Sequence, residues 1–382
     1  MTTITETYDR TWSPVLDGVR ADALDCVQAN LAVVTDRWAG AGAHLALGAT
    51  LRFDTEPDVH GRPRVAASVP YRLAEARDLL GLRVAHRWDV DGATLPGLVA
   101  DNGPLYVVAD AFSLEWTPYR GRQHAEHTFL LSTSDNASVT VVDAYHDETP
   151  WGPHRPGVWR LRSAELTAML PRATAMLLRA EPVTSRPGVL AANARAMADA
   201  LPAIDAYLAV AGTRAADLVV DIWLLGRSRL LHAAWAASRG LPAEPVLAHA
   251  QDWLRLAAQS FVAGRRSRDG AVPESVLDEL ARLLHAEVDL AARLAEAERR
   301  SRPDAVLDTV LDVVAAVLRV DPATVLATPT LRDLPNYSSY RLVEVIERVE
   351  TALDVELTGE DLTPRALTDV HSLCAVFAGR LR

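Results

Sequence analysis

The sequence predicts an α+β fold followed by a separate helical domain, and three observations lead to this. Short apolar runs separated by polar turns fill much of residues 44–160, long helical segments rich in Ala, Leu and Arg follow at 161–300, and a compact helical unit at 303–382 comes after a charged break. A chain of 382 residues has room for two or three domains. We therefore expect an α+β part at 1–160, helices at 161–300 packed on it because each needs a partner for its apolar face, and a C-terminal domain at 303–382.

The composition limits which binding partners and which cellular compartment we expect for the protein. A formal net charge of −11 argues against nucleic acid as a partner. No apolar run reaches the roughly 20 residues that a membrane span needs, and the first twelve residues lack the apolar stretch of a secretory signal. We therefore expect no membrane association. Cys26 and Cys374 are the only cysteines, so we expect no disulfide framework and a reducing, cytoplasmic setting.

Helical and strand patterns alternate in the α+β part. Apolar residues recur with a helical period over Ala21–Trp38, and Asp22 or Asp25 is available as the N-terminal cap. Strand-like pieces at 44–70 come next. The segments that follow predict a helix at 71–82, a strand at 83–90, a short helix at 96–100 and a strand at 104–112.

Two further apolar runs predict a hairpin that bears an imidazole and a carboxylate. His127 opens the first run, a polar turn follows at 134–136, and the second run ends on Asp143. An imidazole beside a carboxylate is a general base with a group that orients it. We therefore expect His127 and Asp143 to lie side by side.

Cys26 is the candidate nucleophile because it falls in the first turn of the predicted helix at 21–38. Free backbone N–H groups and the helix dipole at this position stabilise a thiolate, so we expect a lowered pKa. The alternative is that Cys26 is only a small buried apolar residue.

The C-terminal segment LRDLPNYSSYRLVEVIERVETALDVEL resembles an acyl or peptidyl carrier protein around the serine that bears phosphopantetheine. The run Arg341–Ile346 matches the family and places Ser339 on the modified serine, whereas Ser338 and Tyr340 depart from the usual Asp and Leu. The resemblance implies a four-helix carrier domain with 4'-phosphopantetheine on Ser339, attached by a phosphopantetheinyl transferase. The alternative is a helical docking module in which Ser339 is only an N-cap.

The N-terminal run DCVQANLAVVTDRWAG resembles the nucleophile helix of papain-like, bacteriocin-processing cysteine peptidases, and the order Cys26, His127, Asp143 follows that family. The overall design resembles the butirosin-type acyltransferases, which use this fold to move an acyl chain from a carrier protein to an amine. The peptidases keep an oxyanion-hole Gln six positions before the Cys, and here that position is Arg20. Gln28, Gln123 or backbone N–H groups are therefore the candidate oxyanion donors.

The two resemblances together imply an amide-forming acyltransferase of natural-product biosynthesis. Its acyl group would come from a phosphopantetheine thioester on its own or a partner carrier domain and pass through Cys26 to a small-molecule amine. Two other functions stay open: a thioesterase or amidase with water as acceptor, and a carrier-docking scaffold without chemistry.

Two further histidines compete with this interpretation. His124 is an alternative base, but positions 124 and 127 face opposite sides of a strand, and His127 begins the apolar run. A metal site formed by His124, His127, Asp143 and His146 is a further alternative. Their spacing is not that of a helical zinc motif, so we expect no metal.

Overall fold

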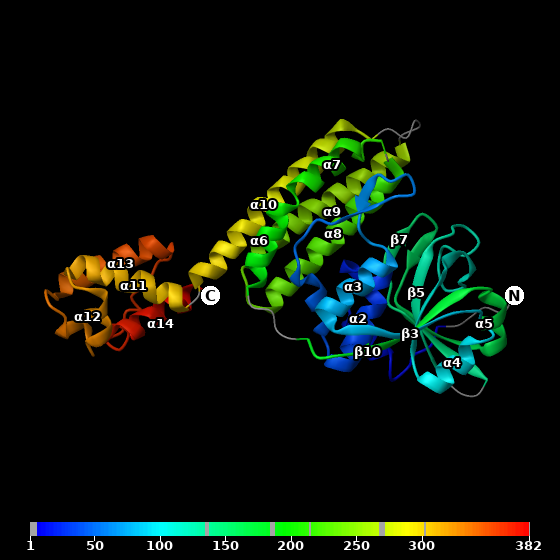
Figure 1. Ribbon diagram of the computed structural model, residues 1–382, viewed down its shortest axis with the longest axis horizontal. Coiled ribbons are helices and arrows are strands. Elements are labelled where there is room, and N and C mark those ends of the chain that lie inside the picture. Colours follow the sequence, from blue (N-terminus) through cyan, green and yellow to red (C-terminus); the bar gives the residue numbers. More distant parts are fainter. Residues whose placement is uncertain are drawn as a thin grey trace. The chain divides into compact units, whose positions relative to one another are not determined.

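The computed structural model describes residues 6–133, 137–183, 188–213, 215–266, 272–301 and 303–381 (Figure 1). Its contacts divide the chain into two compact units. The first comprises residues 1–189, 196–239 and 243–287, and the second comprises residues 190–195, 240–242 and 288–382. The predicted turn at 134–136 lies outside the described residues.

The first unit is built on a six-stranded sheet with the order β3-β10-β4-β5-β6-β9, in which every neighbouring pair is antiparallel. The strands of this sheet are β3 (Leu82–Val90), β4 (Leu105–Asp110), β5 (Glu126–Thr133), β6 (Ser138–Asp143), β9 (Gly157–Arg162) and β10 (Ala173–Ala180). Two small antiparallel pairs accompany it: β1 (Thr55–Pro57) with β2 (Pro63–Val65), and β7 (Asp147–Thr149) with β8 (Gly152–His154). The predicted mixed α/β architecture is confirmed.

Each face of the sheet packs against its own hydrophobic core. Helices α2 (Cys26–Ala39) and α3 (Val69–Leu80) share one core with Leu130 of β5, whereas α4 (Leu95–Asn102) and α5 (Ser163–Met169) share the other with Phe129 and Leu131. Alternate residues of a strand point to opposite faces, so β5 is buried on both sides. The predicted hairpin is present, with Leu130 paired to Val142 in the β5–β6 ladder.

Of the two predicted cap residues, Asp25 caps α2, so the helix begins at Cys26 and not at Ala21 as expected. The Asp25 side chain accepts a hydrogen bond from the Gln28 N–H (2.8 Å), and the Gln28 side chain reaches back to the Asp25 N–H. This reciprocal capping starts the helix at Cys26, after a short α1 (Ser13–Gly18) and a 3-10 turn at Ala21–Ala23. Residues Ala43–Ala49, expected as strand-like, form a 3-10 helix instead and pack against α8 (Ala215–Ser238).

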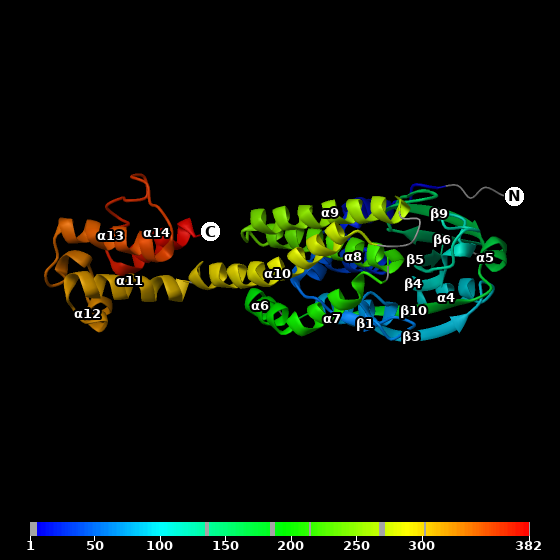
Figure 2. The same cartoon turned by 90° about the horizontal axis from the view of Figure 1, so that it is seen from above.

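The sheet extends beyond the predicted boundary at residue 160, which falls inside β9. Strand β10 follows α5 and inserts between β3 and β4, although the sequence after residue 160 reads as helical. The remaining helices of this region are α6 (Val189–Asp199), α7 (Leu201–Ala211), α9 (Ala243–Arg266) and α10 (Glu274–Ser301). Helices α8 and α9 lie side by side (Figure 2).

Helix α8 packs on the α/β part, as expected for the helical region. The buried Arg227 of α8 donates hydrogen bonds to the carbonyl oxygens of Ala21 (2.8 Å) and Leu24 (2.6 Å), directly before α2. These bonds satisfy backbone acceptors directly before α2. No described helix has the length and apolar character that crossing a membrane requires.

The second unit has one apolar core formed by α11 (Pro303–Leu318), α12 (Pro322–Ala327), α13 (Ser339–Leu353) and α14 (Val370–Arg380). The predicted helix at 339–353 is confirmed, including both ends. The last helix begins at Val370 rather than near Leu367, because the Asp369 side chain caps it by accepting the Ser372 N–H (2.8 Å).

Candidate active site

His127 and Asp143 meet at one end of the β5–β6 hairpin. His127 is the second residue of β5 and Asp143 is the last residue of β6, so both lie at the end of the hairpin away from its turn. The His127 Nε2 lies 2.6 Å from the Asp143 Oδ2, and both side chains are buried. The predicted contact between this imidazole and this carboxylate is therefore present.

Other hydrogen bonds fix the Asp143 carboxylate. The Trp116 Nε1–H donates to Oδ2 (3.1 Å), while the Tyr145 N–H (2.9 Å) and the Asn30 Nδ2 (3.4 Å) donate to Oδ1. Burial alone would raise the pKa of Asp143, but the adjacent imidazoles of His127 and His154 hold that pKa well below its usual range. Asp143 is thus an anion that can orient His127.

The N-terminus of α2 lies against the start of β5. The Thr128 Oγ1 donates a hydrogen bond to the carbonyl oxygen of Cys26 (2.6 Å), and the Asn30 Nδ2 contacts the same carbonyl (3.2 Å) and the Thr128 carbonyl (2.8 Å). Asn30 also reaches Asp143, so one side chain connects the Cys26 turn to the carboxylate. Within the described residues, no hydrogen bond joins the Cys26 thiol directly to His127.

The pKa of the Cys26 thiol is raised well above its usual range, contrary to the expected lowering. Burial of the sulfur is the main cause, and the negative charges of Asp25 and Asp143 act in the same direction. The backbone N–H groups of Cys26 and Val27 lower the pKa, but by less. Cys26 is therefore a neutral thiol at pH 7 and needs a base before it can act as a nucleophile.

A buried charge network holds the cap of α2. The Arg72 Nε donates to the Asp25 Oδ2 (2.7 Å) and its Nη1 to the Glu75 Oε2 (3.0 Å), while the Gln28 Nε2 also donates to that oxygen (2.8 Å). All four side chains are buried. Gln28 thus donates one amide N–H to this network and accepts the Asp25 N–H with its side-chain oxygen.

Arg20, at the position where the peptidases keep the oxyanion Gln, and the remaining candidate donors differ in position. Arg20 forms an ion pair with Asp22 (2.9 Å) and is partly exposed, and Gln123 is exposed in the loop before β5. The backbone N–H groups of Cys26 and Val27 interact with the thiol. Of the candidate donors, these amides at the start of α2 are the ones that contact the Cys26 sulfur.

A third ionisable residue, His154, joins the site and was missed in the sequence. It ends β8, is 1% exposed, and places its Nε2 3.2 Å from the Asp143 Oδ2. Its ring lies beside that of His127, with 5.2 Å between the centroids. Strand β8 has three residues and gives no periodic pattern, so only the topology brings His154 to Asp143.

The other two histidines of the metal alternative lie elsewhere. The exposed His124 places its Nδ1 2.6 Å from the Asp110 Oδ2, and no described contact joins it to Asp143. The His146 Nδ1 is buried without a hydrogen-bond partner, but His146 is not among the converging metal-ligand atoms. In the described part of the chain, the group that could hold a metal ion consists of His127, Asp143 and His154.

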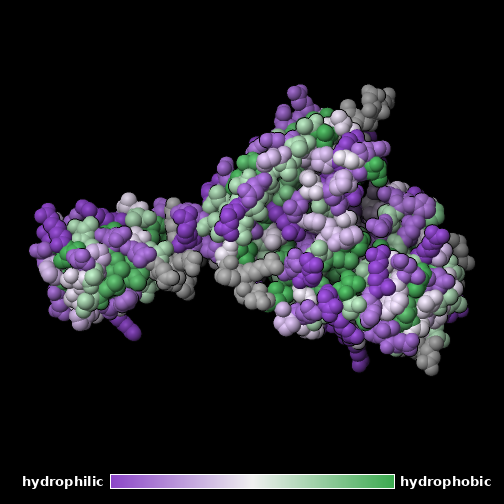
Figure 3. All heavy atoms as spheres, in the orientation of Figure 1, coloured by the Kyte–Doolittle hydropathy of each residue, from purple (hydrophilic) through white to green (hydrophobic). Residues whose placement is uncertain are grey.

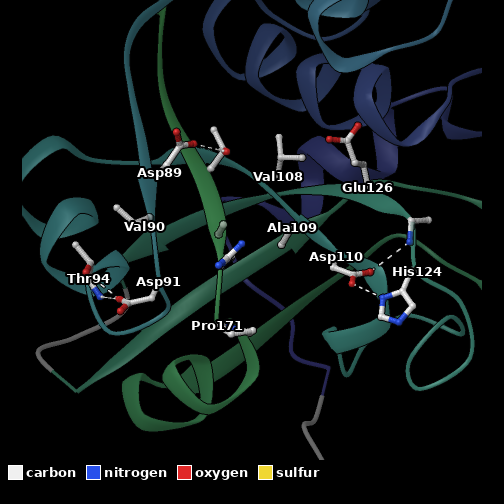
Figure 4. A pocket seen from close by; sticks show the side chains of 14 residues that line it. Asp89, Val90, Asp91, Thr94, Val108, Ala109, Asp110, His124, Glu126 and Pro171 are labelled. Atoms are coloured by element: carbon white, nitrogen blue, oxygen red, sulfur yellow. Dashed lines mark hydrogen bonds and ion pairs between the residues drawn. The ribbon is translucent and has the colours of Figure 1, made fainter. Parts of the chain in front are cut away.

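His124 and Asp110 line an open pocket of about 1030 Å³ (Figure 4). Three carboxylates of this pocket already accept local hydrogen bonds: Asp89 from the Thr174 hydroxyl, Asp91 from the Thr94 hydroxyl and N–H, and Asp110 from the Ala125 N–H. Cys26, His127 and Asp143 are not among the lining residues. The pocket is therefore distinct from the site.

Ser339 is the first residue of α13 and is exposed. The cap is Ser338, whose Oγ accepts the Arg341 N–H (3.2 Å), so the interpretation of Ser339 as the N-cap is wrong. Hydrophobic residues are exposed among hydrophilic ones on the second unit (Figure 3), and Tyr340 and Val343 are 89% and 54% exposed.

Comparisons with known proteins assign neither a family nor a function to the chain. No protein-family model matches the chain, and no curated protein matches it significantly.

Proposed function

We propose that the chain is a cysteine-dependent acyltransferase with a papain-like catalytic part. One observation supports this most directly: the buried His127–Asp143 pair (2.6 Å) lies on two neighbouring strands, and Thr128 joins the start of one of them to the turn that bears Cys26. Acyl transfer to a thiol needs a nucleophile, a base and an acid that orients the base. In this proposal the nucleophile lies at a helix N-terminus, the base on one strand and the acid on the next.

The first half-reaction moves the acyl group onto Cys26. The His127 Nε2–H donates to Asp143, so the Nδ1 of the neutral ring has the lone pair that accepts the thiol proton. The sulfur of Cys26 attacks the thioester carbonyl, and the first-turn amides stabilise the oxyanion. The bond to the pantetheine sulfur then breaks, and that sulfur takes the proton from His127. Because the thiol is neutral at rest, general-base catalysis is essential here.

The second half-reaction forms the amide. An amine attacks the Cys26 thioester, His127 removes a proton from the attacking nitrogen, and the Cys26 sulfur leaves and is reprotonated. Asp143 stabilises the imidazolium in both halves. A thiolate of raised pKa is a poor leaving group, so His127 must return its proton to the Cys26 sulfur as the carbon–sulfur bond breaks.

We further propose that the second unit is a carrier domain with 4'-phosphopantetheine on Ser339. The arguments are its four-helix core and the exposed position of Ser339 at the first residue of α13, where Ser338 supplies the cap and leaves the Ser339 hydroxyl available. A phosphodiester there would face free N–H groups at the positive end of the helix.

The decisive experiment combines intact mass spectrometry with product analysis. After treatment with a phosphopantetheinyl transferase, the wild type should gain one phosphopantetheine and Ser339→Ala none. An acyl pantetheine thioester should then leave an acyl adduct on Cys26, and an added amine should convert it to an amide. Cys26→Ala should gain phosphopantetheine normally but give neither adduct nor amide, and unchanged turnover by this variant would end the proposal.

One observation favours a second function, a carrier-docking scaffold without chemistry. The raised pKa of Cys26 is what a structural cysteine would show. The same mass measurement separates the two, since a scaffold would never become acylated. Release of free acid with every amine tested would instead identify a thioesterase or amidase.

A further inference from the structure

His154 is an imidazole with an unusual environment. It is 1% exposed, and neither its Nδ1 nor its Nε2 has a hydrogen-bond partner. The Nε2 is 3.2 Å from the Asp143 Oδ2, within ion-pair distance but without a hydrogen bond to that oxygen. Burial of a polar group without a hydrogen-bond partner destabilises the folded protein. The acyl-transfer mechanism does not use this ring.

Two further ligand atoms converge on the His154 Nε2. Together with His127 and Asp143 it forms a group whose ligand atoms all lie within 4.8 Å of one another, and all three residues are buried. A tetrahedral ion with bonds of about 2.0–2.1 Å holds its ligand atoms roughly 3.3 Å apart. The His154–Asp143 separation of 3.2 Å already matches this, whereas the His127–Asp143 separation of 2.6 Å would have to open by less than about 1 Å.

The surroundings of Asp143 suit a metal ligand. Trp116 and Tyr145 donate hydrogen bonds to its two oxygens, and such bonds orient a ligating carboxylate and hold it ionised. Imidazole nitrogens and a carboxylate oxygen are ligands for Zn²⁺ and similar divalent ions.

We propose that His127, Asp143 and His154 form a binding site for a divalent transition-metal ion of the Zn²⁺ class. The ion gives the buried His154 nitrogen the partner that the protein does not supply. A metal bonded to the His127 Nε2 leaves the ring proton on Nδ1, which then cannot accept the Cys26 proton. The occupied site therefore inhibits acyl transfer. The binding itself does not depend on the proposed function, and only the inhibition does.

The test is a Zn²⁺ titration by calorimetry on full-length protein that lacks a histidine tag and has been dialysed against a chelator. The wild type should bind one ion per chain, and Co²⁺ in its place should give the visible absorption of a tetrahedral site. His154→Phe, which keeps a buried ring, should weaken binding by more than the roughly 10–100-fold that follows loss of an outer-shell partner. Asp143→Asn should have a similar effect.

Two control variants, His124→Phe and Cys26→Ala, distinguish the possible outcomes. His124→Phe removes an exposed imidazole that already contacts Asp110 and should bind as the wild type does. Cys26→Ala should also bind normally, and this result would hold even if the acyltransferase proposal failed. Wild-type protein that binds no ion, or a His154→Phe variant that folds by circular dichroism and binds as tightly as the wild type, would overturn the site. Loss of binding in Cys26→Ala would place the ion on the thiol and overturn it as well.

Discussion

The Thr128 Oγ1 donates a 2.6 Å hydrogen bond to the carbonyl oxygen of Cys26, and this bond fixes the start of β5 against the first turn of α2. Thr128 directly follows His127, so the bond also sets where His127 lies relative to Cys26. Residues 102 positions apart in the chain thus meet through one hydroxyl.

Thr128→Val removes this hydroxyl and keeps the shape of the side chain. The hydroxyl also accepts a hydrogen bond from the Asn30 Nδ2 (3.2 Å), so we expect a loss of about 1–3 kcal/mol in the free energy of unfolding, the contribution of two hydrogen bonds. A disproportionate loss of acyl transfer, with kcat falling more than this modest destabilisation explains, would indicate misplacement of the base. Denaturant unfolding and steady-state kinetics on the same preparations measure both effects. Kinetics equal to the wild type would show that the bond only stabilises the fold.

Asp143→Asn tests the acid that orients His127. The amide cannot stabilise an imidazolium, so the rate of Cys26 acylation should fall by about 10²–10⁴-fold. Asp110→Asn is the matched control, since Asp110 contacts His124 at a similar distance (2.6 Å) on the surface. That variant should keep the wild-type rate in a single-turnover acylation assay. Equal losses of the acylation rate in both variants would show that the His127–Asp143 pair matters no more for acylation than the His124–Asp110 pair.

The raised pKa of Cys26 predicts how its reactivity varies with pH. The thiolate is the reactive form, so the alkylation rate should be low at pH 6–7 and should still be rising above pH 9, the range in which an ordinary thiol approaches its limit. Rates of iodoacetamide labelling, with Cys26 and Cys374 distinguished by peptide mass spectrometry, test this. Rapid labelling of Cys26 at mildly acidic pH would instead demonstrate a preformed thiolate.

His232 should make the protein sensitive to acid. Burial lowers the pKa of His232 to about 4, and its Nδ1 lies 2.6 Å from the Gly48 carbonyl oxygen. The unfolded chain binds a proton near pH 6.5 and the folded chain only near pH 4, so stability is lost as the pH falls through this window, by about 3 kcal/mol from this group. His232→Gln should flatten the pH dependence of urea unfolding between pH 6.5 and 4. His285→Gln, at an exposed histidine whose Nδ1 contacts the Ala281 carbonyl oxygen, should leave it unchanged.

Arg72→Leu should be among the most damaging single changes near the site. It leaves the Asp25 and Glu75 carboxylates buried without their main counter-ion, at a cost of about 3–5 kcal/mol. Arg77→Leu is the control on the same helix, because its ion pair with Asp78 is exposed and contributes about 0–1 kcal/mol. Thermal unfolding compares the two. Similar melting temperatures would show that Gln28 and Arg52 alone hold the network.

The sequence by itself determined the features that depend on neighbouring residues. A cap signal followed by a helical period placed Cys26 at the start of α2, and the alternating runs placed His127 and Asp143 on paired strands. The helix at 339–353 followed in the same way from its apolar spacing. Capping and periodicity act over a few residues, so one chain is enough to read them.

The tertiary structure alone decided the features that depend on distant contacts. Strand β10 joins the middle of the sheet although its surroundings read as helical, and His154 reaches Asp143 from a three-residue strand. The pKa of Cys26 is the clearest case: the helix N-terminus lowers it, as the sequence suggests, but burial together with Asp25 and Asp143 has the larger effect. Desolvation and charge proximity depend on which residues fold around a group, and local sequence patterns do not contain that information.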